Sequence, residues 1–149
     1  MIGIVIATHG KMSDGMKDAV NTIVGLSDQI VTCNLVNGQS VESLGQDIKV
    51  AIESVDEGQG VIVFTDLVSA SPYNQTIMAI SRLPETKKAE VYILGGVNLP
   101  MVLEAVNHRL LNTDISIAVQ SIMQQGATSM GTWNVSQLEE STDVEDDDF

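Results

Sequence analysis

Four short apolar runs constrain the fold of this chain more than any other feature of its sequence. The runs are rich in β-branched residues and cover residues 2–7, 29–36, 60–66 and 89–96. Runs of this length and composition are typical of strands that are buried on both faces, as the strands of a parallel sheet are. We therefore expect a mainly parallel sheet at the centre of the fold.

Amphipathic helical patterns lie between and after these runs. Apolar residues recur with the spacing of one helix face over residues 16–24, 41–55 and 115–123. Two further helices are predicted from their starts, Ser71-Pro72 and Asn98-Leu99-Pro100, where a capping side chain stands close to a proline. This alternation of strands and helices predicts a three-layer, doubly wound α/β fold with the strand order 2-1-3-4.

The end of the chain is less regular than the rest. Residues 132–135, Thr-Trp-Asn-Val, predict a last antiparallel strand that pairs within this chain or is exchanged with a partner subunit. The final residues form an acidic run, which is typical of a solvated, disordered tail. We expect one domain over residues 1–138, followed by an acidic tail over residues 139–149.

The charge and cysteine content of the chain exclude several classes of function. The chain has 7 basic and 20 acidic residues and a net charge of -13, whereas nucleic acids and anionic membranes require a positive protein face. The single cysteine, Cys33, excludes an internal disulfide, and it lies in a predicted strand as a small buried apolar residue. No leader or membrane-length apolar run is present, so we expect a cytoplasmic protein.

Polar residues follow the first and third apolar runs at the point where each predicted strand ends. Thr8-His9-Gly10 ends the first run, and Thr65-Asp66 ends the third. In an open parallel sheet, ligands bind beyond the carboxyl ends of the strands, and the first and third strands commonly flank that crevice. An aspartate that accepts a hydrogen bond from one imidazole nitrogen leaves the other as a nucleophile. We predict that His9 is the nucleophile and that Asp66 orients it.

The segment "LVSASPYN" after Asp66 leads into a predicted helix. The free backbone N–H groups and the positive dipole of that helix start, with the hydroxyls of Ser69 and Ser71, predict an anion site without an arginine. No dinucleotide or P-loop motif occurs, and no second histidine or cysteine accompanies His9, so we expect neither a cofactor nor a metal. His108 lies near a predicted helix end, where a surface role is favoured.

Three segments together resemble the IIA component of the mannose (mannose–fructose–sorbose) family of the bacterial phosphoenolpyruvate-dependent sugar phosphotransferase system. The segments are "GIVIATHGKMSDGMKDAV", "GVIVFTDLVSASPYNQT" and "GGVNLPMVLEA", and the likeness runs from residue 1 to about residue 122. The resemblance implies that the carrier protein HPr phosphorylates Nε2 of His9 while Asp66 holds Nδ1. It also implies transfer to a IIB component, uptake of sugar through membrane IIC and IID components, and a homodimer with an exchanged final strand.

Thr8, Gly10, Ser69 and Ser71 are the residues expected around the phosphoryl group. This chain departs from the family pattern at Ser69-Ala70, where relatives often have a glycine pair before the Ser-Pro. A histidine phosphatase or class II chelatase is disfavoured, because Thr8 replaces the arginine of the phosphatases and neither a second active-site histidine nor an arginine cluster is evident.

Two other interpretations stay open. One is the phosphotransfer subunit of a phosphoenolpyruvate-dependent dihydroxyacetone kinase, whose first domain resembles the same family and uses the same histidine. The other is a flavodoxin-like module whose crevice only binds a partner. Because a IIA component does not touch the sugar, the substrate stays open among hexoses, hexosamines, sorbose and sugar acids such as gluconate.

Overall fold

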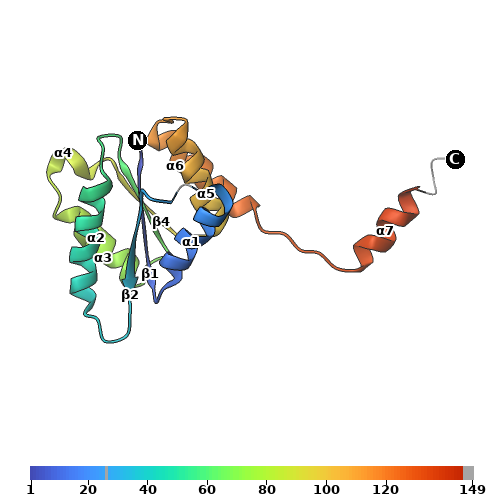
Figure 1. The fold of residues 1–149 in the computed structure, drawn as a ribbon, viewed down its shortest axis with the longest axis horizontal. Coiled ribbons are helices and arrows are strands. Elements are labelled where there is room, and N and C mark those ends of the chain that lie inside the picture. The colour runs from blue at the N-terminus through green and yellow to red at the C-terminus, as the bar shows by residue number, and fades with distance from the viewer. Residues whose placement is uncertain (26, 146–149) are drawn as a thin grey trace.

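The protein is described by a computed structural model, which covers residues 1–25 and 27–145, with side chains described up to residue 140. A four-stranded sheet with the order β2-β1-β3-β4 forms its centre (Figure 1). All three strand pairings are parallel, so the predicted α/β fold and strand order are confirmed. The strands are β1 (Gly3–His9), β2 (Ile30–Leu35), β3 (Val61–Thr65) and β4 (Val91–Gly95).

Helices cover both faces of the sheet (Figure 1). Ile4 and Ile6 of β1 belong to a core formed with α1 (Met12–Val24), α5 (Leu99–Leu110) and α6 (Ile115–Thr128). Val5 and Ala7 belong to the opposite core, formed with α2 (Val41–Val55) and α3 (Ser71–Ser81). Successive side chains of a strand point to opposite faces, so one apolar run fills both cores and produces three layers.

The structure also contains two helices that the apolar patterns do not predict. Short α4 (Glu85–Lys88) precedes β4, and α7 (Ser136–Glu145) follows an extended link that leads away from the body of the molecule (Figure 1). The Asn134 side chain accepts a hydrogen bond from the N–H of Ser136 at 3.0 Å, which caps the start of α7.

The predicted fifth strand differs from what the chain does after α6, whereas the acidic tail stays a prediction. Residues 132–135 form no strand in the single chain, because a strand needs a neighbour and this segment runs away from the sheet. Exchange of the segment with a partner subunit stays a prediction. The predicted disordered tail, residues 139–149, overlaps α7 as far as Glu145, and residues 146–149 lie outside the described part of the chain.

Two other predictions from the sequence concern single residues. Cys33 is buried as predicted, and burial, aided by the negative charge of Asp47, raises the pKa of its thiol to about 12. His108 was expected at the surface, but its side chain is partly buried. Its Nδ1 lies 3.0 Å from the hydroxyl of Thr113 and its Nε2 lies 3.0 Å from a carboxylate oxygen of Glu104, so its role is structural. Within the described chain, no helix has the length and hydrophobicity needed to cross a membrane.

Candidate active site

His9 and Asp66 lie side by side at the carboxyl end of the sheet. His9 ends β1 and Asp66 follows β3, and the parallel register pairs Ala7 with Thr65 just before them. Nδ1 of the His9 ring lies 2.7 Å from Oδ2 of Asp66, and the backbone N–H of His9 donates to the same oxygen at 3.0 Å. A carboxylate only accepts hydrogen bonds, so Nδ1 carries the proton.

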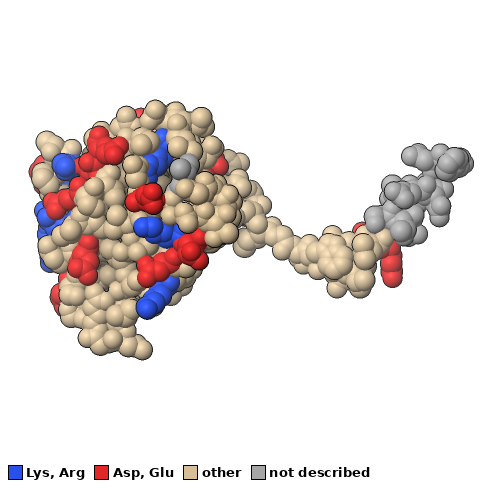
Figure 2. Space-filling view, in the orientation of Figure 1, with Lys and Arg blue, Asp and Glu red and all other residues tan. Residues whose placement is uncertain are grey.

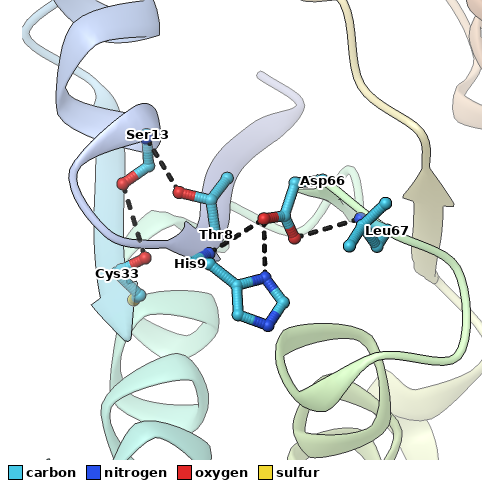
Figure 3. Close-up of polar contacts among 6 residues, drawn as sticks. All are labelled: Thr8, His9, Ser13, Cys33, Asp66 and Leu67. Atoms are coloured by element: carbon cyan, nitrogen blue, oxygen red, sulfur yellow. Dashed lines mark hydrogen bonds and ion pairs between the residues drawn. The ribbon is translucent and has the colours of Figure 1, made fainter. Parts of the chain in front are cut away.

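The other ring nitrogen of His9 points away from this pair. Figure 3 shows Nε2 on the side of the ring opposite Asp66. The His9 side chain is 44% exposed and the Asp66 side chain only 11% exposed. No hydrogen-bond partner of Nε2 occurs among the described residues. The arrangement therefore presents Nε2 to the solvent, the nitrogen that carries the lone pair of a neutral imidazole whose Nδ1 holds the proton, while the orienting carboxylate stays shielded.

Asp66 is held as a carboxylate. Partial burial raises its pKa, but hydrogen bonds from the ring and the backbone of His9, together with electrostatic attraction, outweigh burial and leave the pKa below its ordinary value. The second carboxylate oxygen, Oδ1, accepts a hydrogen bond from the N–H of Leu67 at 3.0 Å (Figure 3). Both oxygens are thus fixed, and the imidazole plane is fixed with them.

Gly10 turns the chain away from β1 directly after His9. It has a φ of 57°, and its N–H donates to the carbonyl of Leu35 at 2.8 Å. A side chain is strained in this left-handed region, which glycine enters without cost. The space around the missing Cβ is open. Gly10 therefore makes a tight turn that leaves the His9 ring uncovered.

A shallow hollow lies on the Gly10 side of His9. It has a volume of about 680 Å³ and is formed by the end of β2 and the loop that leads into α2. Its lining residues are His9, Gly10, Leu35, Val36, Asn37, Gly38, Gln39 and Val41. Among the described residues, no lysine, arginine, aspartate or glutamate lines this hollow, so one side of the histidine faces an uncharged surface.

Thr8 is placed differently from the other predicted phosphoryl-binding residues. Its side chain is completely buried, and its hydroxyl oxygen accepts a hydrogen bond from the N–H of Ser13 at 2.9 Å (Figure 3). The Ser13 hydroxyl bonds to the side chain of Asn34 on β2, and Asn34 in turn donates to Asp14 at 2.7 Å. Thr8 thus caps the first turn of α1 and anchors the loop after His9.

Helix α3 begins with unpaired donors. Ala70 is its N-cap residue, and no cap side chain accepts a hydrogen bond there. Pro72 has no N–H, and the N–H groups of Ser71 and Tyr73 have no partner among the described residues. Ser71 is half-buried and Ser69 is exposed. Free N–H groups at the positive end of a helix favour a bound anion, so the start of α3 has donors available for the anion site, which stays a prediction.

Thr65 is a polar residue of the site region for which the sequence predicted no role. Its side chain is fully buried at the end of β3, and its hydroxyl has no partner among the described residues. A buried hydroxyl without a partner is uncommon because it costs free energy. Its position in the sequence could have indicated a role in the site, because Thr65 is the one polar residue of the strand "VIVFT" and directly precedes Asp66.

The site offers neutral donors and few cations. Lys11 is exposed in the loop after Gly10, and no ion pair of Lys11 occurs in the described chain. No group of three or more potential metal ligands exists among the described residues. The chemistry that this arrangement supports is nucleophilic attack by an oriented imidazole on an electrophile carrying negative charge.

Comparison with known proteins identifies similar chains. The model of the family described as "PTS system fructose IIA component" matches residues 3–123, a span that includes the whole sheet, His9 and Asp66. The chain is 28% identical over 108 residues to the mannose-specific EIIAB component of the PTS system of Escherichia coli (strain K12). That match covers 72% of this chain and 32% of the relative, so the chain spans about a third of the length of this curated protein.

Solved structures show the same fold along nearly the whole chain. The phosphotransferase system component EIIA from Streptococcus agalactiae has 26% sequence identity and a TM-score of 0.73, with 89% of this chain and 97% of that chain covered. The PTS IIA protein associated with the fucose utilization operon from Streptococcus pneumoniae has 27% identity and a TM-score of 0.72, with 92% and 95% covered. Each of these two matches thus covers about nine-tenths of this chain.

Proposed function

The chain belongs to the family of the PTS system fructose IIA component, and on that premise we propose that it carries a phosphoryl group on Nε2 of His9. Phospho-HPr is the proposed donor and a IIB component the proposed acceptor. The observation that carries the proposal is the 2.7 Å hydrogen bond between Nδ1 of His9 and Oδ2 of Asp66, combined with the 44% exposure of the His9 side chain.

The proposed step moves one phosphoryl group between two imidazoles. The lone pair on Nε2 of His9 attacks phosphorus in the phosphohistidine of the donor. The N–P bond of the donor breaks as the new bond forms, and the donor imidazole leaves with the electron pair. Nδ1 of His9 keeps its proton, and Asp66 stabilises the positive charge that develops on the ring. The same step in reverse passes the group to the acceptor.

The neutral surroundings of His9 suit a reversible carrier. The N–H groups at the start of α3 and the hydroxyls of Ser69 and Ser71 are uncharged donors for the phosphoryl oxygens. A strong cationic clamp would stabilise the phosphorylated ground state and slow onward transfer. On the face shown in Figure 2, the loop between β2 and α2 at this end of the molecule carries no charged side chain.

Exposed apolar side chains around His9 support docking of a protein. Met12 is 43% exposed, Leu67 is 58% exposed and Val68 is 62% exposed, and all three lie in or next to the loops after β1 and β3. Exposed apolar groups that surround a reactive residue are typical of a protein interface. Under the proposal the IIB component passes the group to a sugar that enters through the membrane IIC and IID components, and the chain works as a cytoplasmic homodimer.

The proposal is tested by incubation of the full chain with phosphoenolpyruvate, enzyme I and HPr. We expect acid-labile, base-stable label on the wild-type protein and none on His9→Ala. His108→Ala serves as the matched control, because it removes the other histidine of the chain, and it should be labelled normally. Label that does not need HPr, or that persists on His9→Ala, would contradict the proposal.

The acceptor is tested separately, because a dihydroxyacetone kinase subunit would be labelled in the same way. The phosphorylated chain is mixed with a purified mannose-family IIB component or with a dihydroxyacetone kinase subunit. Loss of label to the IIB component supports the sugar-uptake role. Transfer to the kinase subunit alone would replace that role with the alternative one.

A further inference from the structure

Ser69 has a backbone conformation that serine rarely adopts. Its φ is 64°, in the left-handed region, where a Cβ atom crowds the following carbonyl group. The only other described non-glycine residue with a positive φ is Asn112, a residue type that tolerates this region better. Ser69 lies between Asp66 and α3, so this strained conformation lies inside the proposed phosphoryl-binding loop.

The side chain of Asn74 holds Ser69 in place. Its Nδ2 donates to the carbonyl oxygen of Ser69 at 2.9 Å, and the backbone N–H of Asn74 donates to the carbonyl oxygen of Ala70 at 2.9 Å. Two successive carbonyls of the loop are thus tied to one residue in the first turns of α3. Asn74 is exposed, so its amide is not required to fill the core.

The other parts of the loop are fixed by separate contacts. The N–H of Leu67 donates to Oδ1 of Asp66 at 3.0 Å. Val68 packs over Gly95 so closely that a Cβ on Gly95 would lie 2.5 Å from Cγ2 of Val68. Ser69 therefore connects two anchored ends, and its φ decides the direction in which the chain enters α3.

We infer that Asn74 is a positioning residue for phosphoryl transfer, which acts by holding Ser69 in the left-handed conformation. In that conformation the unpaired N–H groups of Ser71 and Tyr73 stay at the carboxyl end of the sheet, on the side of His9. The inference rests on the proposed function, because its effect is seen in transfer through His9. Asn74 itself does not touch the reacting atoms.

A double-mutant cycle with Asn74→Ala and Ser69→Gly tests the inference. The full chain is phosphorylated by phospho-HPr, and the effect of Asn74→Ala is taken as a ratio of rates within each background. With Ser69 present, we expect Asn74→Ala to slow transfer about five- to thirtyfold, the ratio that the usual left-handed penalty produces. With Ser69→Gly, we expect a change of less than about twofold, because glycine adopts a positive φ without that penalty.

The loss is expected in the maximal rate more than in the KM for phospho-HPr, because the loop geometry changes and the exposed apolar residues remain. Asn74→Leu, which keeps the size and removes the donor, should behave like Asn74→Ala. The backbone chemical shifts of Ser69 should leave the left-handed range in both variants. Asn107→Ala replaces another exposed helical asparagine, whose side chain makes no hydrogen bond in the described structure, and it should transfer at the wild-type rate.

Equal slowing in both backgrounds, or no slowing in either, would overturn the inference about Asn74. In that case label that still depends on His9 would leave the proposed function standing. Label on His9→Ala would overturn the proposed function whatever the cycle shows. A melting temperature for each variant well above the assay temperature ensures that the rates compare folded proteins.

Discussion

Helices α3 and α5 begin at the same end of the sheet, but a side chain caps the first N–H groups of α5 and none caps those of α3. Each follows a parallel strand, β3 or β4, and each has a proline in its first turn. In α5 the Asn98 side chain accepts a hydrogen bond from the N–H of Met101 at 3.2 Å and donates to the carbonyl of Gly126 at 3.0 Å. In α3 the corresponding residue is Ala70, whose methyl side chain cannot accept a hydrogen bond.

Under the proposed function, this difference separates a helix start with a structural role from one that binds the phosphoryl group. Ser40 and Asp114 cap α2 and α6 in the manner of Asn98, and Thr8 serves the first turn of α1. Replacing a capping residue with alanine usually costs about 1 kcal/mol of stability. Helix α3 forgoes that stabilisation at the helix start that follows Asp66, so its donors stay available to an incoming anion.

Of these predictions, the largest effect on the transfer rate is expected from a substitution that caps the start of α3. Ala70 has the extended backbone of an N-cap residue, so the carboxylate of Ala70→Asp should cap α3 without strain. We expect stability to rise by about 1 kcal/mol while phosphoryl transfer to His9 falls about 10²- to 10³-fold, since a donor is occupied and a negative charge is added. Urea unfolding and the rate of labelling by phospho-HPr measure the two changes.

Ala70→Asn separates the two causes, because it occupies the donor without adding charge. Its loss of rate should lie between that of the wild-type protein and that of Ala70→Asp. If Ala70→Asp were labelled at the wild-type rate, the unpaired N–H groups of α3 would have no part in transfer.

A smaller loss of transfer rate is expected when the carboxylate that orients His9 is replaced. Asp66→Asn keeps the shape of the side chain but removes the charge that orients Nδ1 and stabilises the imidazole as it becomes positive. We expect a fall of about 10²-fold in the labelling rate, in the range typical of a positioned acid–base group. Unchanged far-ultraviolet circular dichroism is the control for folding, and a wild-type rate would show that Asp66 is only structural.

Removing the cap of α5 should lower the stability of the protein and leave the transfer rate unchanged. Asn98→Ala removes the cap of α5 and one of the two side-chain hydrogen bonds that the carbonyl of Gly126 accepts, so that only the bond from the Ser129 hydroxyl remains. We expect a loss of about 1–2 kcal/mol in the free energy of unfolding, measured with urea. The rate at which the folded variant is labelled should not change. A slower rate would mean that α5 also contributes to the site, and the contrast between the two helices would fail.

The smallest predicted effect is a difference in how the stability contributions of Asp66 and Asn98 depend on pH. Because the pKa of Asp66 is lowered in the folded protein, its ionised form stabilises the fold above the ordinary aspartate pKa of about 4. That stabilisation is lost as the pH falls through the lower folded value. The stability difference between wild type and Asp66→Asn should shrink in acid. The difference between wild type and Asn98→Ala should stay constant, since an asparagine does not titrate.

Much of the fold and the central pair of the site could be predicted from the sequence. The β-branched runs and the Ser-Pro and Asn-Leu-Pro starts are local signals, and they predicted the four strands and helices α3 and α5. The pairing of His9 with Asp66 followed from one general rule, that the carboxyl ends of adjacent parallel strands meet. Helix α7 was missed because its polar, acidic sequence is typical of a solvated tail.

What the sequence determined by itself is which residues end the strands: His9 after β1 and Asp66 after β3. Only the tertiary structure decided which of their atoms meet. Residues 57 positions apart in the chain had to meet before Nδ1 was bound and Nε2 left free. The same holds for Thr8, whose hydroxyl the fold assigns to α1, and for Ser69, whose left-handed φ depends on Asn74. Residue types are local information, whereas hydrogen-bond partners depend on which atoms the packing brings within reach.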